Sequence, residues 1–400
     1  MEREYSIEQA EHYFALECQK LQLSVELKKF GEPPFQTVAC SLFRNPKEKV
    51  SEGGGKGIGK QSELSAKFEA LEVFTGLASQ VSALYDLFSL SEIRLLQIPV
   101  IASKIFPELL SVDFPQQEKK LPWIAYTRYD SNEKCYLPAI CSHPFYYRKP
   151  FADDDFDYSN LYLTATTNGI ATGCTRTEAL IHALLEVIER HSLSIFLIET
   201  FLKENPKDPK KFDIQTLPKE LKEIAENIIT TTGYDLIIYH MPNEIDIPVY
   251  GVLLHHPTLA IPIKGCGASL NPSYAIERAL LEALEVYHYD PSNIEDQRSI
   301  ERLTQWPKLQ RCAEFDLSCF KKNSPFEHTA VTFNSSQEYL AHIVSQLQSA
   351  HFSIYFNETY VSEHLSTVHV VIPEAEDFFA VGMGLVVPLQ KKGMEALCPS

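Results

Sequence analysis

Three pairs of glutamates recur in this sequence with a spacing of three residues. They are Glu69/Glu72, Glu186/Glu189 and Glu282/Glu285. On an α-helix this spacing puts both carboxylates of a pair on one face, where like charges repel by roughly 0.2–0.5 kcal/mol. A divalent cation reverses that repulsion, and carboxylate oxygens are ligands that Mg²⁺ prefers. The pairs therefore indicate binding of Mg²⁺ and, through it, of a phosphate-bearing ligand.

Each pair follows a glycine-rich segment, so the three regions share one plan. The segments are 53–59, 166–173 and 265–269. Glycine-rich turns at helix N-termini supply backbone N–H groups that bind phosphate. The repeat therefore predicts three glycine turns, which open helices at about 61–75, 175–199 and 273–289.

The helices differ in how strongly their composition favours burial. In the third, Arg278, Glu282 and Glu285 form one stripe on a helix that is otherwise almost wholly apolar. Such a helix is buried, and its charges then need partners. In the first, Ser65 shares a stripe with the glutamates. The second has a wider polar face that solvent alone would explain, formed by Glu178, His182, Glu186, Glu189 and Arg190.

Two other interpretations of these segments stay open from sequence alone. Glu-x-x-Glu is also common on solvated helix surfaces, because glutamate is a good helix former. Residues 54–60 match the G-x-x-x-x-G-K pattern of a P-loop, but Gln61 stands where Ser or Thr should bind Mg²⁺. A parallel βαβ series is also not evident, so we interpret this match as accidental.

The remaining elements favour an α+β or irregular α/β fold, because strands and helices mix without strict alternation. We expect one unit over residues 1–400, with an N-terminal subregion (1–110), a core nucleotide-binding region (150–300) and a C-terminal subregion (301–400). Region 113–160 is expected to be mostly loop and short strand. Further helices are predicted at 7–21 and 335–349, and strands at 23–30, 36–44, 234–240, 248–255, 258–264, 352–357 and 366–372.

Bulk properties restrict partners and compartment. The net charge is −17, with 53 acidic and 36 basic residues, which argues against nucleic acid as a partner. The first residues are charged and lack the apolar core of a signal peptide, and no apolar run approaches the roughly 18 residues of a membrane span. Nine scattered cysteines without a CxxC pair are typical of reduced thiols. We expect a cytoplasmic protein that does not bind membranes.

The repeated blocks resemble the YcaO family. The blocks that carry the resemblance are Gly55–Gly57, Ser65–Glu72, Asn168–Arg190 and Ala275–Ala283. The resemblance implies a YcaO-like fold, with mixed sheets and flanking helices around a central nucleotide site, and it implies ATP and Mg²⁺ as cofactors. Val73, Ala171 and Cys174 depart from residues common in the family.

The resemblance also implies a set of site residues. Metal ligands would be Glu69, Glu72, Glu186, Glu189 and Glu282. Contacts to ATP would come from these five and from Lys56, Ser65, Glu178, Arg190 and Arg278. No residue is identified as the catalytic base.

The activity that the resemblance implies is activation of a peptide backbone amide. In the azoline version, a Cys, Ser or Thr side chain of a ribosomally made peptide closes a ring on the preceding carbonyl. Thioamide or amidine formation and an inactive nucleotide-binding scaffold are the alternatives. A separate leader-peptide-recognition protein and a homodimer are implied as partners.

Four other features have structural explanations that compete with chemistry. Asp153–Asp155 with Asp157 is interpreted as a solvated loop, with a metal-binding loop as the alternative. His255–His256 is interpreted as structural, with metal ligation as the alternative. Cys174 and Cys266 are interpreted as small residues that fill tight turns, with reactive thiols as the alternative. The aromatic residues of 144–162 fit a peptide groove or core packing equally well.

Overall fold

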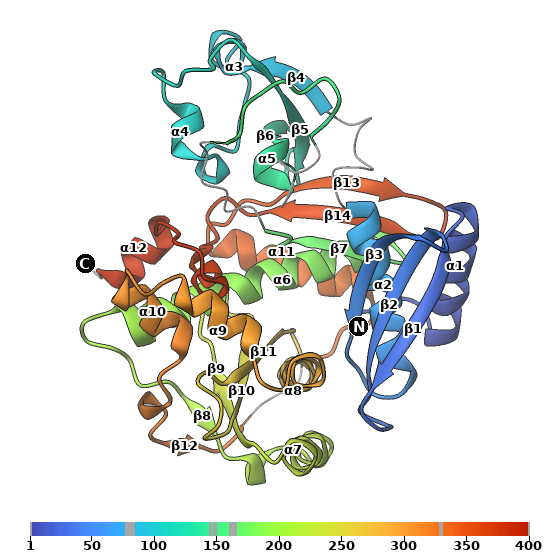
Figure 1. The fold of residues 1–400 in the computed structure, drawn as a ribbon, viewed down its shortest axis with the longest axis vertical. Coiled ribbons are helices and arrows are strands. Elements are labelled where there is room, and N and C mark those ends of the chain that lie inside the picture. The colour runs from blue at the N-terminus through green and yellow to red at the C-terminus, as the bar shows by residue number, and fades with distance from the viewer. Residues whose placement is uncertain are drawn as a thin grey trace.

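The computed structural model describes residues 2–76, 85–143, 146, 150–159, 166–327 and 331–398. Three β-sheets and the helices that cover them make up an α+β fold, as predicted from the sequence (Figure 1). The chain end near residue 2 lies close to the middle of the molecule, whereas residue 398 lies at its edge (Figure 1).

Each sheet takes its strands from a different combination of chain segments. The first is antiparallel, in the order β1-β2-β3 (Ser24–Phe30, Thr37–Asn45, Glu48–Gly55). The second has the order β11-β10-β9-β8-β12 (Ile263–Ala268, Val249–His255, Asp235–His240, Lys211–Phe212, Asn323–Ser324). The third has the order β4-β5-β13-β14-β7 (Tyr85–Ser89, Lys120–Arg128, Tyr355–Val361, Ser366–Val371, Ile170–Gly173), and β6 (Lys134–Pro138) pairs with β5.

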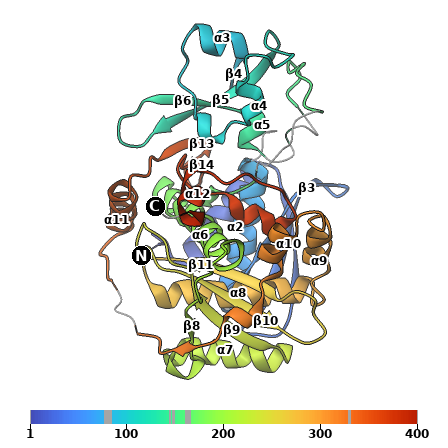
Figure 2. The ribbon, with the colours of Figure 1, turned by 90° about the vertical axis from the view of Figure 1, so that its left-hand side faces the viewer.

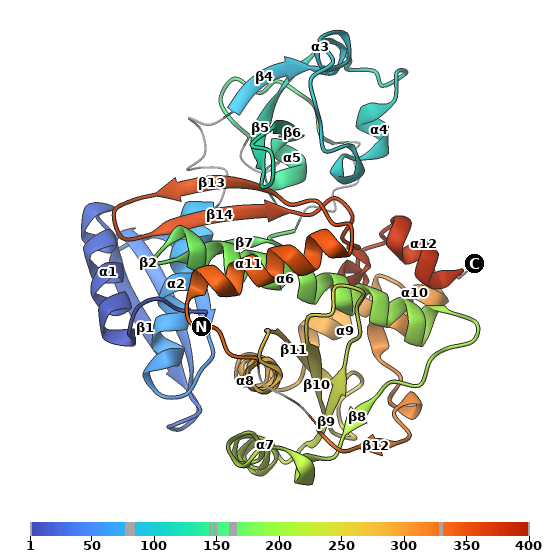
Figure 3. The same ribbon diagram turned by 180° about the vertical axis from the view of Figure 1, so that it is seen from behind.

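Three helices cover these sheets and approach one another at the centre (Figure 2). Helix α2 (Lys60–Gly76) packs on β2 and β3, and α8 (Pro272–Tyr289) packs on β10 and β11. Helix α6 (Arg176–Leu197) packs on β7 and β14 and also reaches β11 (Figure 3). The π-helical turn η3 (Ile198–Leu202) follows it.

The other helices lie around this centre. They are α1 (Ile7–Lys20), α3 (Leu90–Leu95), α4 (Pro107–Leu110), α5 (Ala139–Ser142), α7 (Lys219–Thr232), α9 (Ile294–Glu301), α10 (Pro307–Glu314), α11 (Ser336–Ser349), α12 (Lys391–Leu397) and the 3₁₀ segment η6 (Phe378–Met383). None of the helices in the described part of the chain combines the length and hydropathy of a membrane-spanning segment.

Residues 85–143, here called the lobe, stand apart at the top of Figure 1. The lobe has its own core around Trp123 and Tyr126. It joins the rest of the third sheet where the end of β5 pairs with β13. The expected loop region 113–160 therefore contains a hairpin, β5 and β6, in its first half.

The glycine-rich segments are partly turn and partly strand: residues 57–59 and 167–169 turn as predicted, whereas 265–268 is strand and the third predicted turn was wrong. Phosphate binding by these segments stays a prediction. Each segment contributes a strand (β3, β7 or β11) that packs against the helix that follows it. A Cβ on Gly55 would collide with the backbone of Ser62 and Ala66, and a Cβ on Gly265 would collide with that of Ala279. Glycine is therefore needed because strand and helix approach closely.

Several boundaries also differ from the sequence-based ones. The expected strand at 258–264 begins only at Ile263, because residues 256–262 form a turn. The strand expected at 352–357 starts at Tyr355 and continues to Val361. Capping fixes the starts of the two later helices. The Thr175 side chain accepts a hydrogen bond from Glu178 N, and Asn271 precedes Pro272 in the first turn of α8.

Candidate active site

The helices α2, α6 and α8 bring their glutamate pairs into one acidic cluster, defined here as Glu69, Glu72, Glu186, Glu189, Glu282 and Glu285. The charges of Glu186 and Glu69 act on Glu72 from the neighbouring helix and from its own. The charge of Glu282 reaches both Glu186 and Glu189 across the gap between α8 and α6. Six carboxylates from distant parts of the chain thus lie within electrostatic reach of one another.

Three cationic side chains lie among these carboxylates. Lys56, in the loop after β3, forms an ion pair with Glu282. Arg190 Nη1 lies 3.6 Å from Glu189 Oε1. The Arg278 guanidinium also interacts electrostatically with Glu189 and Glu282. Its buried Nε has no hydrogen-bond partner among the residues described. The described cluster therefore combines six carboxyl groups with three cations.

Removal of water raises the pKa of most of these carboxyl groups. It raises the pKa of Glu186 to about 7 against the opposing Arg190 charge. It raises the pKa of Glu285 to about 8 against the opposing Lys56 charge. The pKa of Glu72 is well above its usual value, because burial and two neighbouring carboxylates act together. Burial also works to raise the pKa of Glu282, but Lys56 and Arg190 outweigh it and lower that pKa.

Backbone N–H groups of the glycine segments donate to the acidic cluster in this structure. Gly169 N donates to Glu186 Oε2 over 3.2 Å, and Thr172 N donates to Glu72 Oε2 over 3.1 Å. The N–H groups that the sequence assigned to phosphate therefore orient glutamate side chains. They fix where the carboxylates point.

A cavity of about 1000 Å³ opens beside the cluster. Glu186, Arg190 and Glu282 line it, together with Lys264 and Cys266 of β11. Burial raises the pKa of the Cys266 thiol, which therefore stays protonated at neutral pH. This favours the structural interpretation of Cys266 over a reactive thiolate.

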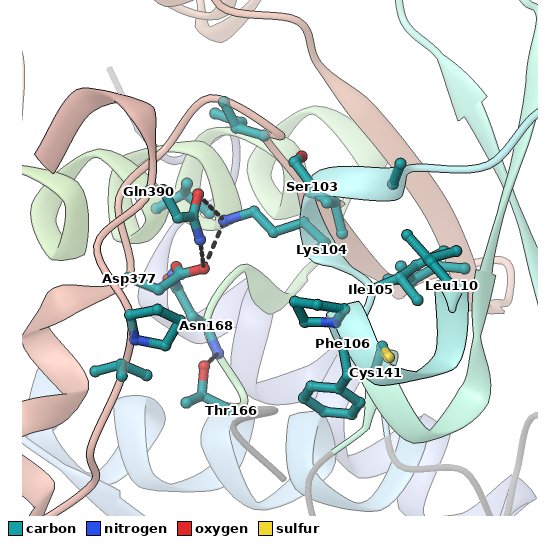
Figure 4. Close-up of a pocket in the computed structure, with 18 of the residues that line it drawn as sticks. Ser103, Lys104, Ile105, Phe106, Leu110, Cys141, Thr166, Asn168, Asp377 and Gln390 are labelled. Atoms are coloured by element: carbon teal, nitrogen blue, oxygen red, sulfur yellow. Dashed lines mark hydrogen bonds and ion pairs between the residues drawn. The ribbon is translucent and has the colours of Figure 1, made fainter. Parts of the chain in front are cut away.

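A second cavity, of about 850 Å³, adjoins the first (Figure 4). Thr166 and Asn168 line both cavities. The walls of the second cavity are largely apolar and come from the lobe, β14 and the C-terminal segment; they include Ile105, Phe106, Leu110, Val370 and Leu389. At one end Lys104 Nζ lies 2.5 Å from Asp377 Oδ2, and Gln390 Nε2 donates to the same oxygen over 3.0 Å (Figure 4).

Two expected site residues lie differently from the rest. Glu178 is 1% exposed, and its two oxygens accept backbone N–H groups of Cys174 (2.9 Å) and Glu4 (2.5 Å). Ser65 is half-buried on α2, one turn before Glu69. Neither contacts the acidic cluster through a described hydrogen bond or ion pair, and their roles toward ATP stay predictions.

The interpretation of the α6 polar face as possibly solvated was wrong. Glu189 is only 4% exposed, and Glu186 and Arg190 face the cavity. Sequence reasoning also left residues out of the site. Glu285 belongs to the cluster, and its place in the repeat was the available signal. His143, Asn168 and Lys264 line the cavity, and only Asn168 lies in a motif that the sequence singled out.

The donor set suits Mg²⁺ with a phosphate ligand. Oxygen ligands predominate, and burial, followed by the neighbouring carboxylates, raises the pKa of Glu186 and Glu285 against the opposing cations. Arg278 carries an unpartnered nitrogen that an anion could occupy. Within the described ranges, no three His, Cys, Asp or Glu side chains are arranged to hold a metal ion by themselves. Lys56 and Arg190 pair with Glu282 and Glu189.

Comparison with known proteins identifies the family to which this chain belongs. A family model described as YcaO cyclodehydratase, ATP- and Mg²⁺-binding, matches residues 54–376. The chain belongs to the YcaO family. ATP and Mg²⁺ are the ligands of this family, and the three glutamate-bearing helices of this YcaO protein fall within the matched range.

Two curated relatives of this YcaO protein match only in part. An uncharacterised protein in the tfuA 3′ region of Rhizobium leguminosarum bv. trifolii is 27% identical over 130 residues, which is 30% of each chain. An uncharacterised protein of Methanothermobacter thermautotrophicus is 26% identical over 266 residues, or 65% of this chain and 62% of that protein. The matches therefore span less than two thirds of either relative.

Solved structures share the fold. YcaO from Methanopyrus kandleri bound with AMPPCP and Mg²⁺ gives a TM-score of 0.67 at 18% identity, covering 94% of this chain and 93% of that one. A heterocyclase in complex with substrate and cofactor gives 0.60 at 16% identity, covering 93% and 52%. The E. coli microcin synthetase McbBCD complex gives 0.58 at 13% identity, covering 88% of each. At these identities the likeness is one of fold.

Proposed function

We propose that this chain uses ATP and Mg²⁺ to activate backbone amides of a peptide, most simply by cyclodehydration of Cys, Ser or Thr to azolines. The observation that carries the proposal is the acidic cluster, in which six carboxylates share three cations beside a cavity of about 1000 Å³. That volume matches the range typical of small-molecule sites. The family match supplies the reaction class.

The residues divide by charge. Glu69, Glu72, Glu186, Glu189 and Glu282 would hold Mg²⁺, which supplies neutralisation of phosphate charge when bound. Arg190 and Arg278 would stabilise the charge that develops on the transferred phosphoryl group. Lys56 keeps Glu282 ionised, because its charge lowers the pKa of that carboxyl group. The protein's part is to position the reactants and to balance their charges.

The second cavity supports a peptide as the other substrate. It meets the first at Thr166 and Asn168, and its apolar walls suit the side chains of an extended peptide. A reacting amide at the junction would lie between the phosphate site and the residues that flank it in the peptide.

The test is incubation of the purified chain with ATP, Mg²⁺ and a panel of synthetic peptides that each carry one Cys, Ser or Thr. Cyclodehydration removes water, so mass spectrometry should show a loss of 18 Da, a mass difference fixed by the chemistry of the step. With a sulfide donor present, a gain of 16 Da would instead identify thioamide formation. ATP binding by calorimetry without turnover of any peptide would indicate an inactive scaffold.

We further propose that a separate leader-peptide-recognition protein delivers the substrate and that the chain works as a homodimer. A fold neighbour belongs to the McbBCD complex, which supports the need for partner proteins. Size-exclusion chromatography with light scattering would measure the oligomeric state. A strictly monomeric mass at all concentrations would contradict the dimer.

A further inference from the structure

His143 is a buried histidine without a hydrogen-bond partner. Its side chain is 1% exposed, and neither Nδ1 nor Nε2 has a partner within the described part of the chain. An unpaired buried polar group is destabilising, and such groups in native proteins mark places where a ligand or water completes the bonding. His143 lines the same cavity as Glu186 and Arg190.

Asn168 presents a second unpartnered group to this cavity. Its Oδ1 is buried and has no described partner, while its backbone N–H donates to Thr166 Oγ1 over 3.3 Å (Figure 4). Asn168 lies where the two cavities meet. Two unsatisfied polar side chains from different segments therefore line the space in which the peptide amide would lie.

The ring of His143 stacks on the ring of a second histidine, His369. The two ring centroids lie 6.0 Å apart. His369 Nδ1 lies 2.8 Å from Tyr126 Oη in the core of the lobe, which fixes the orientation of its ring. Burial lowers the pKa of His143 to about 4. At neutral pH the imidazole is therefore uncharged and keeps one nitrogen that accepts a proton.

We propose that His143 is the catalytic residue that accepts the proton of the attacking substrate side chain in the reaction proposed above. For a cysteine substrate, the proton of Sγ moves to the imidazole while Sγ forms a bond to the preceding carbonyl carbon. The carbonyl π electrons move to oxygen, which takes the γ-phosphoryl group of ATP and releases ADP. Loss of the amide N–H proton and departure of phosphate then leave the C=N bond of the ring.

The competing explanation is that His143 only fills space against His369. The two explanations differ in a measurable way. A space-filling ring is needed for folding or rigidity, and free imidazole in solution cannot replace it. A proton acceptor that is removed by truncation leaves a hole beside the substrate, which free imidazole can enter to perform the same transfer.

The experiment compares wild type with His143→Ala and His255→Ala, using the single-cysteine peptide panel, ATP and Mg²⁺. His255 is the matched control, because its Nδ1 is also buried and unpartnered but does not line the cavity. We expect His143→Ala to lower kcat about 100-fold or more, with unchanged ATP affinity and partial recovery on addition of imidazole. His255→Ala should keep the wild-type rate.

Each result decides the matter. Wild-type turnover by His143→Ala, or a lost rate that imidazole does not restore, overturns the role of His143 and leaves the proposed function intact. Absence of any peptide mass change with wild type overturns the proposed function, and the role of His143 with it. If His143→Ala does not fold, His143→Gln takes its place. Loss of turnover with normal ATP binding then supports the role, and wild-type turnover refutes it.

Discussion

The carboxylates of this protein include two kinds, which differ in the partners that the protein gives them. Glu17, on α1, is 2% exposed and accepts hydrogen bonds from Tyr360 and Ser362, with Lys20 Nζ at 3.2 Å. Glu244 lies 3.1 Å from His191 Nε2 and 3.1 Å from Lys392 Nζ. Burial opposes ionisation at both sites, but these partners outweigh it and lower both pKa values, that of Glu244 to about 2.

The acidic cluster behaves in the opposite way. Burial raises the pKa of Glu186 to about 7 and of Glu285 to about 8, and the cations within reach do not offset it. Glu17 and Glu244 find enough partners inside the protein and stabilise its fold. The cluster has more carboxylates than cations, so its groups are suited to positive charge that arrives with a ligand. Under the proposed function, the same residue type thus serves structure in one place and binding in another.

The largest expected effect comes from removing charge from the cluster. Glu186→Gln and Glu189→Gln should each reduce ATP consumption about 100-fold or more, because electrostatic stabilisation of the transferred group is lost. Phosphate release in the presence of a modified peptide measures this. Glu17→Gln is the control and should keep the rate per folded molecule. Full turnover in both cluster variants would erase the distinction between the two kinds of carboxylate.

The next largest effect is on stability, at the strand–helix contact that positions α8 and its glutamates. Gly265→Ala places a Cβ against the backbone of Ala279 and Ala283, and should destabilise the protein by about 3 kcal/mol. Urea unfolding measures the free energy. Gly382→Ala is the control, because a Cβ there meets nothing within 4 Å. Equal stability of both variants would show that close strand–helix contact does not set the place of α8.

A smaller effect on stability is expected at Glu17, whose hydrogen-bond partners all come from the protein itself. Glu17→Gln weakens charge-assisted hydrogen bonds from Tyr360 and Ser362, and should lower the free energy of unfolding by about 1–3 kcal/mol. Affinity for Mg²⁺ and ATP, measured by calorimetry, should not change. A large loss of ATP affinity would mean that α1 positions the cluster as well.

The smallest effect is a pH dependence with opposite signs in the two regions. Glu186 and Glu285 have raised pKa values in the fold, so they bind more protons folded than unfolded between pH 4.5 and 8. Their contribution to stability is present below pH 4.5 and is lost as pH rises to 8. Glu244, with a pKa of about 2, contributes above pH 4.5 and loses its contribution as pH falls toward 2.

Melting temperatures without Mg²⁺, measured from pH 2 to pH 8, should fall both toward pH 8 and toward pH 2. Glu285→Gln should flatten the decline between pH 4.5 and 8 and should raise the melting temperature at pH 8. Added Mg²⁺ and ATP should flatten the same decline between pH 4.5 and 8 in wild type, because bound cations favour the ionised carboxylates. A Glu285→Gln variant that melts lower than wild type at pH 8 would contradict this.

The periodic parts of this structure were predictable from sequence. The apolar surround of Glu282 predicts a buried α8, and spacing alone places Glu69 with Glu72 and Glu186 with Glu189 on single helix faces. The α+β class follows from the mixed order of elements. These features depend on residues close together in the chain, where helix geometry fixes their relation.

The features that could not be predicted from sequence depend on contacts between distant segments. Gly55 and Gly265 read as turn formers, and only the backbone of the facing helix shows that they permit close packing. His143 follows a short helix in an irregular region, so nothing local predicts its place in the cavity wall. Glu178 matches the family motif, but the backbone N–H of Glu4, far away in sequence, helps to engage its carboxylate.

The lobe enters the chain between α2 and β7, after the first glutamate-bearing helix and before the second. It supplies one wall of the second cavity through Ile105, Phe106 and Leu110, but contributes none of the acidic cluster. Substitutions in that wall therefore leave the charges of the acidic cluster in place. Under the proposed function, new substitutions at Ile105, Phe106 and Leu110 would alter which peptides are accepted while the use of ATP is inherited unchanged.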